Sequence, residues 1–170
     1  MRAPSPPIAK AMGPPSPPRG GEGLVVAALR AGPDMDKVLE KPGVQPTALT
    51  APYWAAAAAG RLVIQRCGGC RRWVHFPKPR CPGCGSGDLA YEPVSGRGTV
   101  ETFTVIHRSF VPGFEGPYVA AWIALPEQDG LRTFANITGC PPDEVRIGME
   151  VEVWFEPRGE QKLPNFRKIQ

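Results

Sequence analysis

The chain has 170 residues, which is enough for one ordinary domain or two small ones. Its 22 prolines and 20 glycines are far above average usage, so much of the chain must lie in loops, turns or tails. No apolar run approaches the length of a membrane span, and the proline-broken N-terminus lacks the pattern of a signal peptide. We therefore expect no membrane span and a cytoplasmic location, which suits reduced thiols.

The net charge of +4 is unevenly distributed along the chain. Residues 41–87 hold seven Lys or Arg and no Asp or Glu, whereas residues 88–170 hold eight basic and twelve acidic side chains. An electrostatic partner is therefore expected on the middle segment and not on the C-terminal half.

Residues 1–46 predict an extended or disordered Pro-rich tail or linker. Their first part, MRAPSPPIAKAMGPPSPPRGGEG, combines proline clusters with no hydrophobic periodicity. Recognition of these prolines by a partner is the alternative to a solvated tail, which is the interpretation we favour.

Residues 47–60 predict a short docking helix. Thr50 is placed to accept hydrogen bonds from the first free amides, and Gly60 suits the left-handed residue that follows the last turn. The five alanines between them favour the helix strongly. A helix this short is not stable alone, so its two large side chains, Tyr53 and Trp54, should anchor it to the rest of the protein or to another chain.

Residues 61–90 contain the stretch CGGCRRWVHFPKPRCPGC, which holds two C-x-x-C pairs separated by ten residues. This spacing is typical of a zinc ribbon, because each C-x-x-C turn offers two thiolates and a hairpin brings the pairs to opposite sides of the ion. RLVIQRC and RRWVHF are expected to be its strands, and the glycines to permit the tight turns. Two disulfides are the competing interpretation. The predicted zinc ligands are Cys67, Cys70, Cys81 and Cys84.

The predicted metal site is structural, since four cysteines leave no position for water or substrate. His75 lies between the pairs but is expected to be an ordinary packed or surface histidine. Nearby arginines should partly offset the charge of −2 that four thiolates around one zinc ion create. Cys140 has no predicted partner.

Residues 91–170 have an all-β pattern. TVETFTVI, YVAAWIAL, LRTFANI and EVEVWFE are apolar or alternating runs of strand length, and NFRKIQ fits a fifth strand. GCPPDEVRIG is the segment that could form a helical turn. Five short strands predict a small Greek-key barrel of the OB type.

The sequence lacks a constellation of residues that would make the chain an enzyme by itself. Its two histidines, His75 and His107, lie in no metal-binding helix motif and beside no obvious nucleophile. The loop SFVPGFEGPY carries Phe110, Val111 and Phe114, which either fold back over the barrel end or insert into a partner.

This order of elements resembles the zinc-ribbon/OB-fold acyl-CoA-associated family, a domain of unknown function that partners thiolase-superfamily enzymes. The segments that carry the resemblance are APYWAAAAAGRLVIQRCGGC, FPKPRCPGCGS, SGRGTVETFTVI, GPYVAAWIAL, IGMEVEVWFE and LPNF, which cover residues 47–170 in family order. The fold expected is mainly β, with a short N-terminal helix, a rubredoxin-like zinc ribbon and a five-stranded OB-fold barrel.

The resemblance implies a non-catalytic accessory subunit of a thiolase-fold enzyme, either a thiolase/synthase or a retro-aldolase acting on steroid or other side-chain CoA esters. It implies a structural zinc, a hetero-oligomer, a further association with a hot-dog-fold hydratase in some members, and a CoA thioester at the interface. The residues expected to meet partner or CoA are Tyr53, Trp54, Arg61, Arg66, Arg71, Arg72, Lys78, Arg80, Phe110 and Phe114.

The residues alone also allow two other functions. OB barrels and zinc ribbons often bind single-stranded nucleic acid, but the barrel half here is net acidic, which disfavours the basic groove that such binding needs. The other alternative is a small enzyme that turns over an acyl-CoA without a partner.

Overall fold

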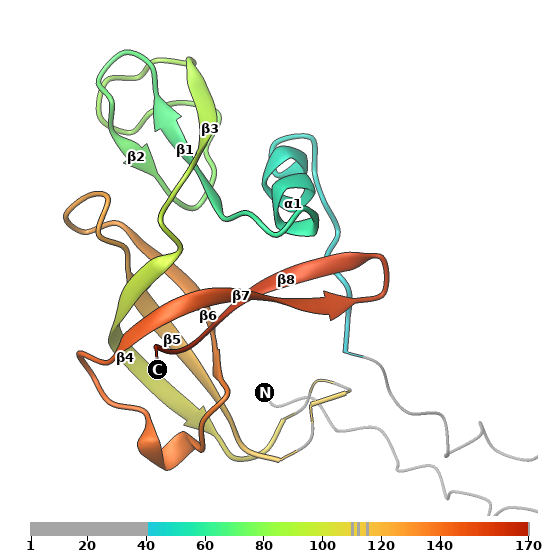
Figure 1. The fold of residues 1–170 in the computed structure, drawn as a ribbon. Helices are drawn as coiled ribbons and strands as arrows, with labels where there is room; N and C mark the ends of the chain where they lie inside the picture. The colour runs from blue at the N-terminus through green and yellow to red at the C-terminus, as the bar shows by residue number, and fades with distance from the viewer. Residues whose placement is uncertain (1–40, 110, 112, 115, 170) are drawn as a thin grey trace, which may run out of the picture. The chain divides into compact units, whose positions relative to one another are not determined.

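The computed structural model describes residues 41–109, 111, 113–114 and 116–169. Most of the predicted tail, up to residue 40, and the predicted contact residue Phe110 lie outside these described residues. The elements in chain order are α1 (Ala51–Ala58), β1 (Val63–Cys67), β2 (Trp73–Val74), β3 (Leu89–Pro93), β4 (Arg97–Ile106), β5 (Tyr118–Ala124), β6 (Arg132–Thr138), the 3-10 helix η1 (Pro142–Glu144), β7 (Glu150–Arg158) and β8 (Gln161–Lys168). Figure 1 shows the predicted fold class: one short helix, a small sheet at the cysteines, and a five-stranded barrel.

The helix α1 forms where the alanines predicted it, but its start differs from the prediction. Thr50 has helical backbone angles (φ −95°, ψ −9°) and its side chain makes no capping hydrogen bond. The carbonyl of Thr47 instead accepts the N–H groups of Thr50 and Ala51, at 3.0 and 2.8 Å. The predicted cap was wrong because a capping side chain needs an extended backbone, which Thr50 does not have. Gly60 is left-handed (φ +73°), as predicted.

The ribbon sheet has three strands in the order β2-β1-β3. The strands β1 and β2 were predicted, whereas β3 was not, because LAYEP has little alternation and ends in proline. It pairs antiparallel with all of β1, from Val63 opposite Pro93 to Cys67 opposite Leu89. The predicted boundary between ribbon and barrel at residue 90 therefore falls within a strand.

The five remaining strands close into a barrel in the order β4-β5-β6-β8-β7. Alternate residues point inward, and the core includes Val100, Val119, Ile123, Val151 and Phe166. The segment predicted to make a helical turn contains η1, and the fifth strand starts earlier than NFRKIQ suggested. Among the described residues, no helix has the length and apolar character that a bilayer crossing requires.

The barrel closes through a short parallel seam between β6 and β8. Only Ile137 with Phe166 and Thr138 with Arg167 are in register there, whereas β7 and β8 pair over eight positions. The helix α1 lies beside β8 and also contacts β1 (Figure 1), so helix, ribbon and barrel meet near this seam.

The close approach of β4 and β5 gives a stability prediction. A Cβ added at Gly98 would lie 2.4 Å from Cγ2 of Ile123 and 2.8 Å from the backbone oxygen of Ala124. Gly98→Ala should therefore lower the free energy of unfolding by about 1–3 kcal/mol, as overpacking does. Chemical denaturation measures this change. The matched control is Gly87→Ala, where a Cβ meets open space; equal stability of the two variants would contradict the packing argument.

Candidate metal centre and partner surface

The four predicted zinc ligands converge at one end of the ribbon sheet. Their sulfur atoms all lie within 4.8 Å of one another. The Sγ atoms of Cys67 and Cys84 are 3.6 Å apart, and those of Cys70 and Cys81 are 3.5 Å apart. All four cysteines are free, so the disulfide interpretation is wrong. Four sulfurs around one zinc ion at 2.3 Å would be separated by about 3.8 Å, so the donor set fits tetrahedral zinc.

Two similar turns hold these thiols. Each turn ends in a left-handed residue directly after its second cysteine, Arg71 (φ +62°) in one and Gly85 (φ +76°) in the other. Two glycines within the turns lie close to side chains: a Cβ at Gly68 would overlap the Asp88 carboxylate, and one at Gly83 would press on the Arg72 side chain, so either change would require that side chain to move. The left-handed backbone thus occurs directly after the second cysteine of each pair, and not at the glycines between the cysteines as we predicted.

The thiols differ in proton affinity before a metal is bound. Backbone N–H groups of Cys84 and Gly83 lower the pKa of Cys81 to about 6. The Ser86 backbone lowers the pKa of Cys84, but hydrogen bonds with the Cys67 and Cys70 thiols outweigh it and raise that pKa to about 11.

Zinc bound by the four thiolates would be closed to other ligands and would supply folding free energy at the cysteine end of the ribbon, where Cys67, Val74 and Cys81 form a small separate cluster. The rest of β1 joins the main core through Val63 and Ile64.

The basic residues of the ribbon divide into paired and unpaired groups. Arg66 and Arg71 both form ion pairs with Glu92 of β3, at 2.9 and 3.5 Å. The charge distribution along the sequence did not predict this pairing, because Glu92 lies in the acidic segment, residues 88–170, and not in the basic segment that holds the arginines. Arg61, Arg72 and Lys78 are exposed, and no ion pair links them to a described acidic residue. Arg80 donates to the carbonyl of Gly85 at 3.3 Å.

A mainly apolar groove of about 270 Å³ lies where α1, the end of the ribbon strand β2 and the β6/β8 seam meet, and we call it the seam groove. Its lining residues are Thr50, Tyr53, Trp54, His75, Phe76, Pro77, Thr133, Phe134, Ala135, Asn136, Leu163, Pro164 and Asn165. Of the predicted contact residues that the structure describes, only Tyr53 and Trp54 line it. The arginines and Lys78 do not.

His75 is a packed side chain of this groove. Its ring centroid lies 6.1 Å from that of Tyr53 and 4.5 Å from that of Phe76, and Nε2 is 3.3 Å from Oγ1 of Thr133. Burial lowers the pKa of His75 to about 4, so the ring is neutral near pH 7.

Beside the groove, three aromatic side chains form an exposed aromatic patch: Phe76, Trp122 and Phe134. Phe76 is 53% exposed and Phe134 is 50% exposed, although both are large and apolar. Neither phenylalanine is among the contact residues predicted from the sequence. The exposure of Phe134 could have been predicted from the strand pattern of LRTFANI. Side chains alternate between the two faces of a strand, so a strand that buries Thr133 and Ala135 directs Phe134 outward.

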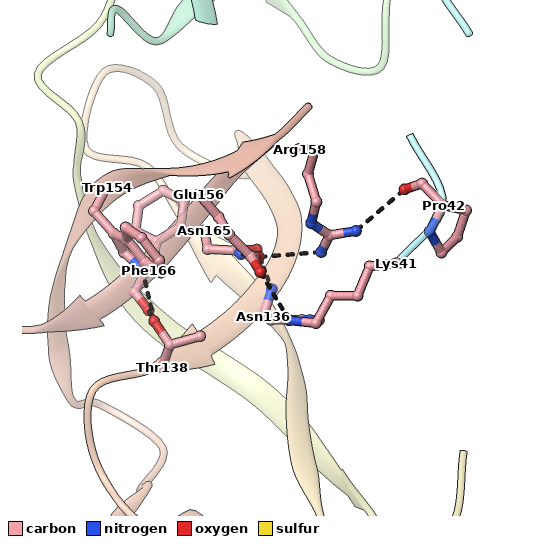
Figure 2. A network of polar contacts seen from close by, with 9 residues as sticks. All are labelled: Lys41, Pro42, Asn136, Thr138, Trp154, Glu156, Arg158, Asn165 and Phe166. Carbon is pink, nitrogen blue, oxygen red and sulfur yellow. Dashed lines mark hydrogen bonds and ion pairs between the residues drawn. The ribbon is translucent and has the colours of Figure 1, made fainter. Parts of the chain in front are cut away.

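A charged cluster lies next to the groove (Figure 2). The carboxylate of Glu156 accepts hydrogen bonds from Lys41 (2.7 Å), Arg158 (3.1 Å) and the amide of Asn165 (2.6 Å). Arg158 also donates to the carbonyl of Pro42 at 3.1 Å, so the segment before α1 is held against β7 and β8. Burial raises the pKa of Glu156, but the hydrogen bonds from Lys41 and Arg158 outweigh it, and the net direction is downward.

Phe114, a predicted contact residue, packs beside this cluster. Its ring lies 4.8 Å from that of Tyr118, and the charged groups of Lys41 and Arg158 are 5.0 and 5.6 Å from its centroid. Phe114 is half-buried, and its contact with a partner stays a prediction.

The metal site gives the first prediction about the ribbon. Purified protein should contain about one zinc ion per chain, and Cys67→Ser or Cys84→Ser should lose both the zinc and the folded ribbon. Elemental analysis and circular dichroism measure the two effects. Cys140→Ser, which changes a cysteine outside the cluster, is the control. A metal-free preparation with wild-type thermal stability would contradict the assignment.

His75 gives a pH prediction. A folded pKa of about 4 against an ordinary 6.5 means that the unfolded chain binds the proton more readily. This stabilising contribution is fully present above pH 6.5 and is lost as the pH falls toward 4. Between about pH 7.5 and 5.5 the wild type should lose roughly 1 kcal/mol of unfolding free energy that His75→Gln does not lose. Denaturation at both pH values tests this, with His107→Gln as control; parallel curves for the wild type and His75→Gln would refute it.

Two family models match consecutive parts of the chain. The rubredoxin-like zinc ribbon domain of ChsH2 matches residues 54–90, and the C-terminal OB-fold domain of ChsH2 matches residues 91–156. Together they cover more than half of the chain and include all four clustered cysteines.

Individual relatives agree with these models. A "Probable enoyl-CoA hydratase alpha subunit" of Thermomonospora curvata is 43% identical over 116 residues, which are 68% of this chain and 36% of the relative. The "Benzoylsuccinyl-CoA thiolase subunit BbsA" of Geobacter metallireducens is 35% identical over 92 residues, 54% of this chain and 60% of the relative. The chain thus spans about a third to three-fifths of the length of these two relatives.

A solved structure, "Ltp2-ChsH2(DUF35) aldolase", contains a chain that is 38% identical, with a TM-score of 0.69, and the match covers 74% of this chain and 98% of that one. The ribbon, the barrel, the cysteine cluster and this match place the chain in the ChsH2/DUF35 family of zinc-ribbon/OB-fold proteins.

Proposed function

We propose that this chain is a non-catalytic accessory subunit that binds a thiolase-fold enzyme acting on acyl-CoA and supports that enzyme's active site. The observation that carries the proposal is the seam groove with its aromatic patch. Two phenylalanines that are half exposed or more, beside an apolar groove, are typical of a protein-binding surface.

The chemistry of the groove favours binding over catalysis. Its titratable side chains are Tyr53 and His75. Burial raises the pKa of Tyr53 and lowers that of His75 to about 4, so neither side chain exchanges a proton readily near pH 7. A zinc ion held by four thiolates has no open position for a substrate.

The relatives support the same direction. By name, these relatives are a subunit of a CoA thiolase, a subunit of an enoyl-CoA hydratase and an aldolase of Ltp2 and ChsH2. The family resemblance adds the thiolase fold as the partner class. A hot-dog-fold hydratase is a further component that the hydratase name suggests.

A CoA thioester at the interface belongs to the same proposal. Arg61, Arg72 and Lys78 are exposed and free of ion pairs with the described acidic residues, so their charges are available for phosphate groups. Arg66 and Arg71 are less suited, because Glu92 already neutralises them in part.

Single-stranded nucleic acid is the second candidate, and the aromatic patch is the observation in its favour. Aromatic side chains on an OB barrel can stack with bases. Arg132 lies 5.2 Å from the Trp122 ring of the patch, but it is paired with Glu101 at 3.2 Å, which weakens its attraction for phosphates.

Co-expression separates the two candidates. The full chain, produced together with the thiolase-fold enzyme encoded beside its gene, should co-elute with that enzyme in size-exclusion chromatography and raise its turnover of acyl-CoA. The isolated chain should turn over none. Failure to co-elute with any neighbouring thiolase-fold enzyme, together with salt-dependent binding of the isolated chain to oligonucleotides, would favour nucleic acid instead.

A further inference from the structure

The edge of β6 beside the seam groove presents backbone groups that β5 does not use. The N–H of Asn136 is directed toward the Asn165 side chain, whose Oδ1 lies 3.4 Å away, so this N–H points away from β5. In an antiparallel ladder, residues two positions apart direct their N–H and C=O groups the same way. Phe134, which is opposite Trp122, therefore also directs its backbone N–H and C=O away from β5 and toward the seam groove that it lines.

The backbone of β8 does not pair with the Phe134 N–H and C=O, because the registered β6–β8 ladder stops before it reaches Phe134. Its registered pairs are Ile137 with Phe166 and Thr138 with Arg167. The carbonyl of Phe166 accepts the Thr138 hydroxyl at 3.4 Å, so the Phe166 backbone faces β6. The residue two positions earlier that would continue the ladder toward Phe134 is Pro164, which has no N–H to donate.

The charged cluster keeps the two strands in this arrangement (Figure 2). Asn165 is 1% exposed, and its amide nitrogen donates to Glu156 at 2.6 Å while its oxygen faces the Asn136 N–H. Because Lys41 and Arg158 hold the Glu156 carboxylate, Asn165 is fixed in place between the strands. The opening between β6 and β8 is thus built by specific side chains.

The groove beyond this strand edge has a size and lining suited to part of a peptide. Its volume of about 270 Å³ is slightly below that of small-molecule pockets, which are about 300–1,000 Å³. Trp54, Phe76, Phe134 and Leu163 make its walls largely apolar. An open strand edge beside an apolar pocket is the arrangement by which proteins bind extended peptides through strand addition.

We propose that the seam groove binds a short extended segment of the thiolase-fold partner, which pairs its backbone with Phe134 and inserts one apolar side chain between α1 and β8. This inference rests on the proposed function, since the partner enzyme supplies the segment. In this proposal, Pro164 keeps the backbone of Phe134 at the edge of β6 free to pair with the partner segment.

Substitutions in the walls test the pocket. Phe134→Glu and Phe76→Glu each replace a half-exposed aromatic ring by a charge, and each should weaken the complex with the co-expressed thiolase-fold enzyme at least tenfold in titration calorimetry. Both side chains are half exposed, so zinc content and thermal stability should stay near wild type. Ile147→Glu is the matched control, because Ile147 is 69% exposed and lies outside the groove; it should bind as wild type does.

Two measurements test the backbone pairing. Hydrogen exchange at the Phe134 amide, followed by mass spectrometry, should slow in the complex relative to the free chain. Pro164→Ala supplies an N–H that can pair with the Phe134 carbonyl within the chain, so it should weaken the partner complex several-fold without loss of stability. A merely structural role for Pro164 would not produce this combination.

The outcomes separate this inference from the proposed function. If the wild-type chain does not bind the enzyme, both fail together. If the complex forms and the two Glu variants bind as wild type does, or the Phe134 amide exchanges equally in both states, only the groove inference is overturned. It is also overturned if the groove variants abolish self-association of the free chain or binding to a single-stranded oligonucleotide while the enzyme complex is unaffected.

Discussion

The two-residue seam between β6 and β8 is the constraint on which the surface of this molecule depends. A barrel with a full ladder at this position would have no strand edge, and α1 would have no opening to cover. Pro164 stops the ladder, and Asn165 occupies the place of the missing pairing with its side-chain amide. Tyr53 and His75 then fill the space over the barrel interior, and what remains outside them is the seam groove.

The zinc ribbon has an indirect part in this arrangement. The buried cluster at its cysteine end is small, so zinc bound by the four cysteines would add stability there, whereas β1 shares the main core through Val63 and Ile64. The loop that returns from β2 carries His75, Phe76 and Pro77 to the seam, and Gln65 of β1 holds this loop by accepting the Lys78 N–H at 2.8 Å. The ribbon therefore positions one wall of the groove, although none of its four clustered cysteines lines it.

The parts of the structure that are local in sequence could be predicted from it. Two C-x-x-C turns specify a metal site by spacing alone, alanines with a terminal glycine specify a short helix, and alternating runs specify the barrel strands. The strand β3 could not be predicted, because LAYEP becomes a strand only by pairing with β1. The ion pairs of Glu92 and Glu156 also depend on residues distant in sequence.

The seam groove could not be predicted either, because its walls come from residues that are distant along the chain. Tyr53 and Trp54 were identified as anchors from their size, but their neighbours Phe76, Phe134 and Pro164 come from three other parts of the chain. In sequence, Pro164 is an irregularity near the start of the predicted last strand, and only the register of β6 and β8 shows which hydrogen bond it removes. Two of the arginines predicted to contact a partner or CoA are less available than the sequence indicated, because Arg66 and Arg71 already form ion pairs with Glu92 within the ribbon.

The strand β3 has a consequence for how this kind of protein can change during evolution. The two family models divide the chain between residues 90 and 91, inside β3, yet the groove takes walls from both sides of that division. Exchanging either half for that of a distant relative would combine mismatched walls, and it would also divide the one core that Tyr53, Leu62 and Ile64 share with the barrel. Ribbon and barrel should therefore be inherited together, and recombination at their border should be selected against wherever the proposed partner enzyme depends on this surface.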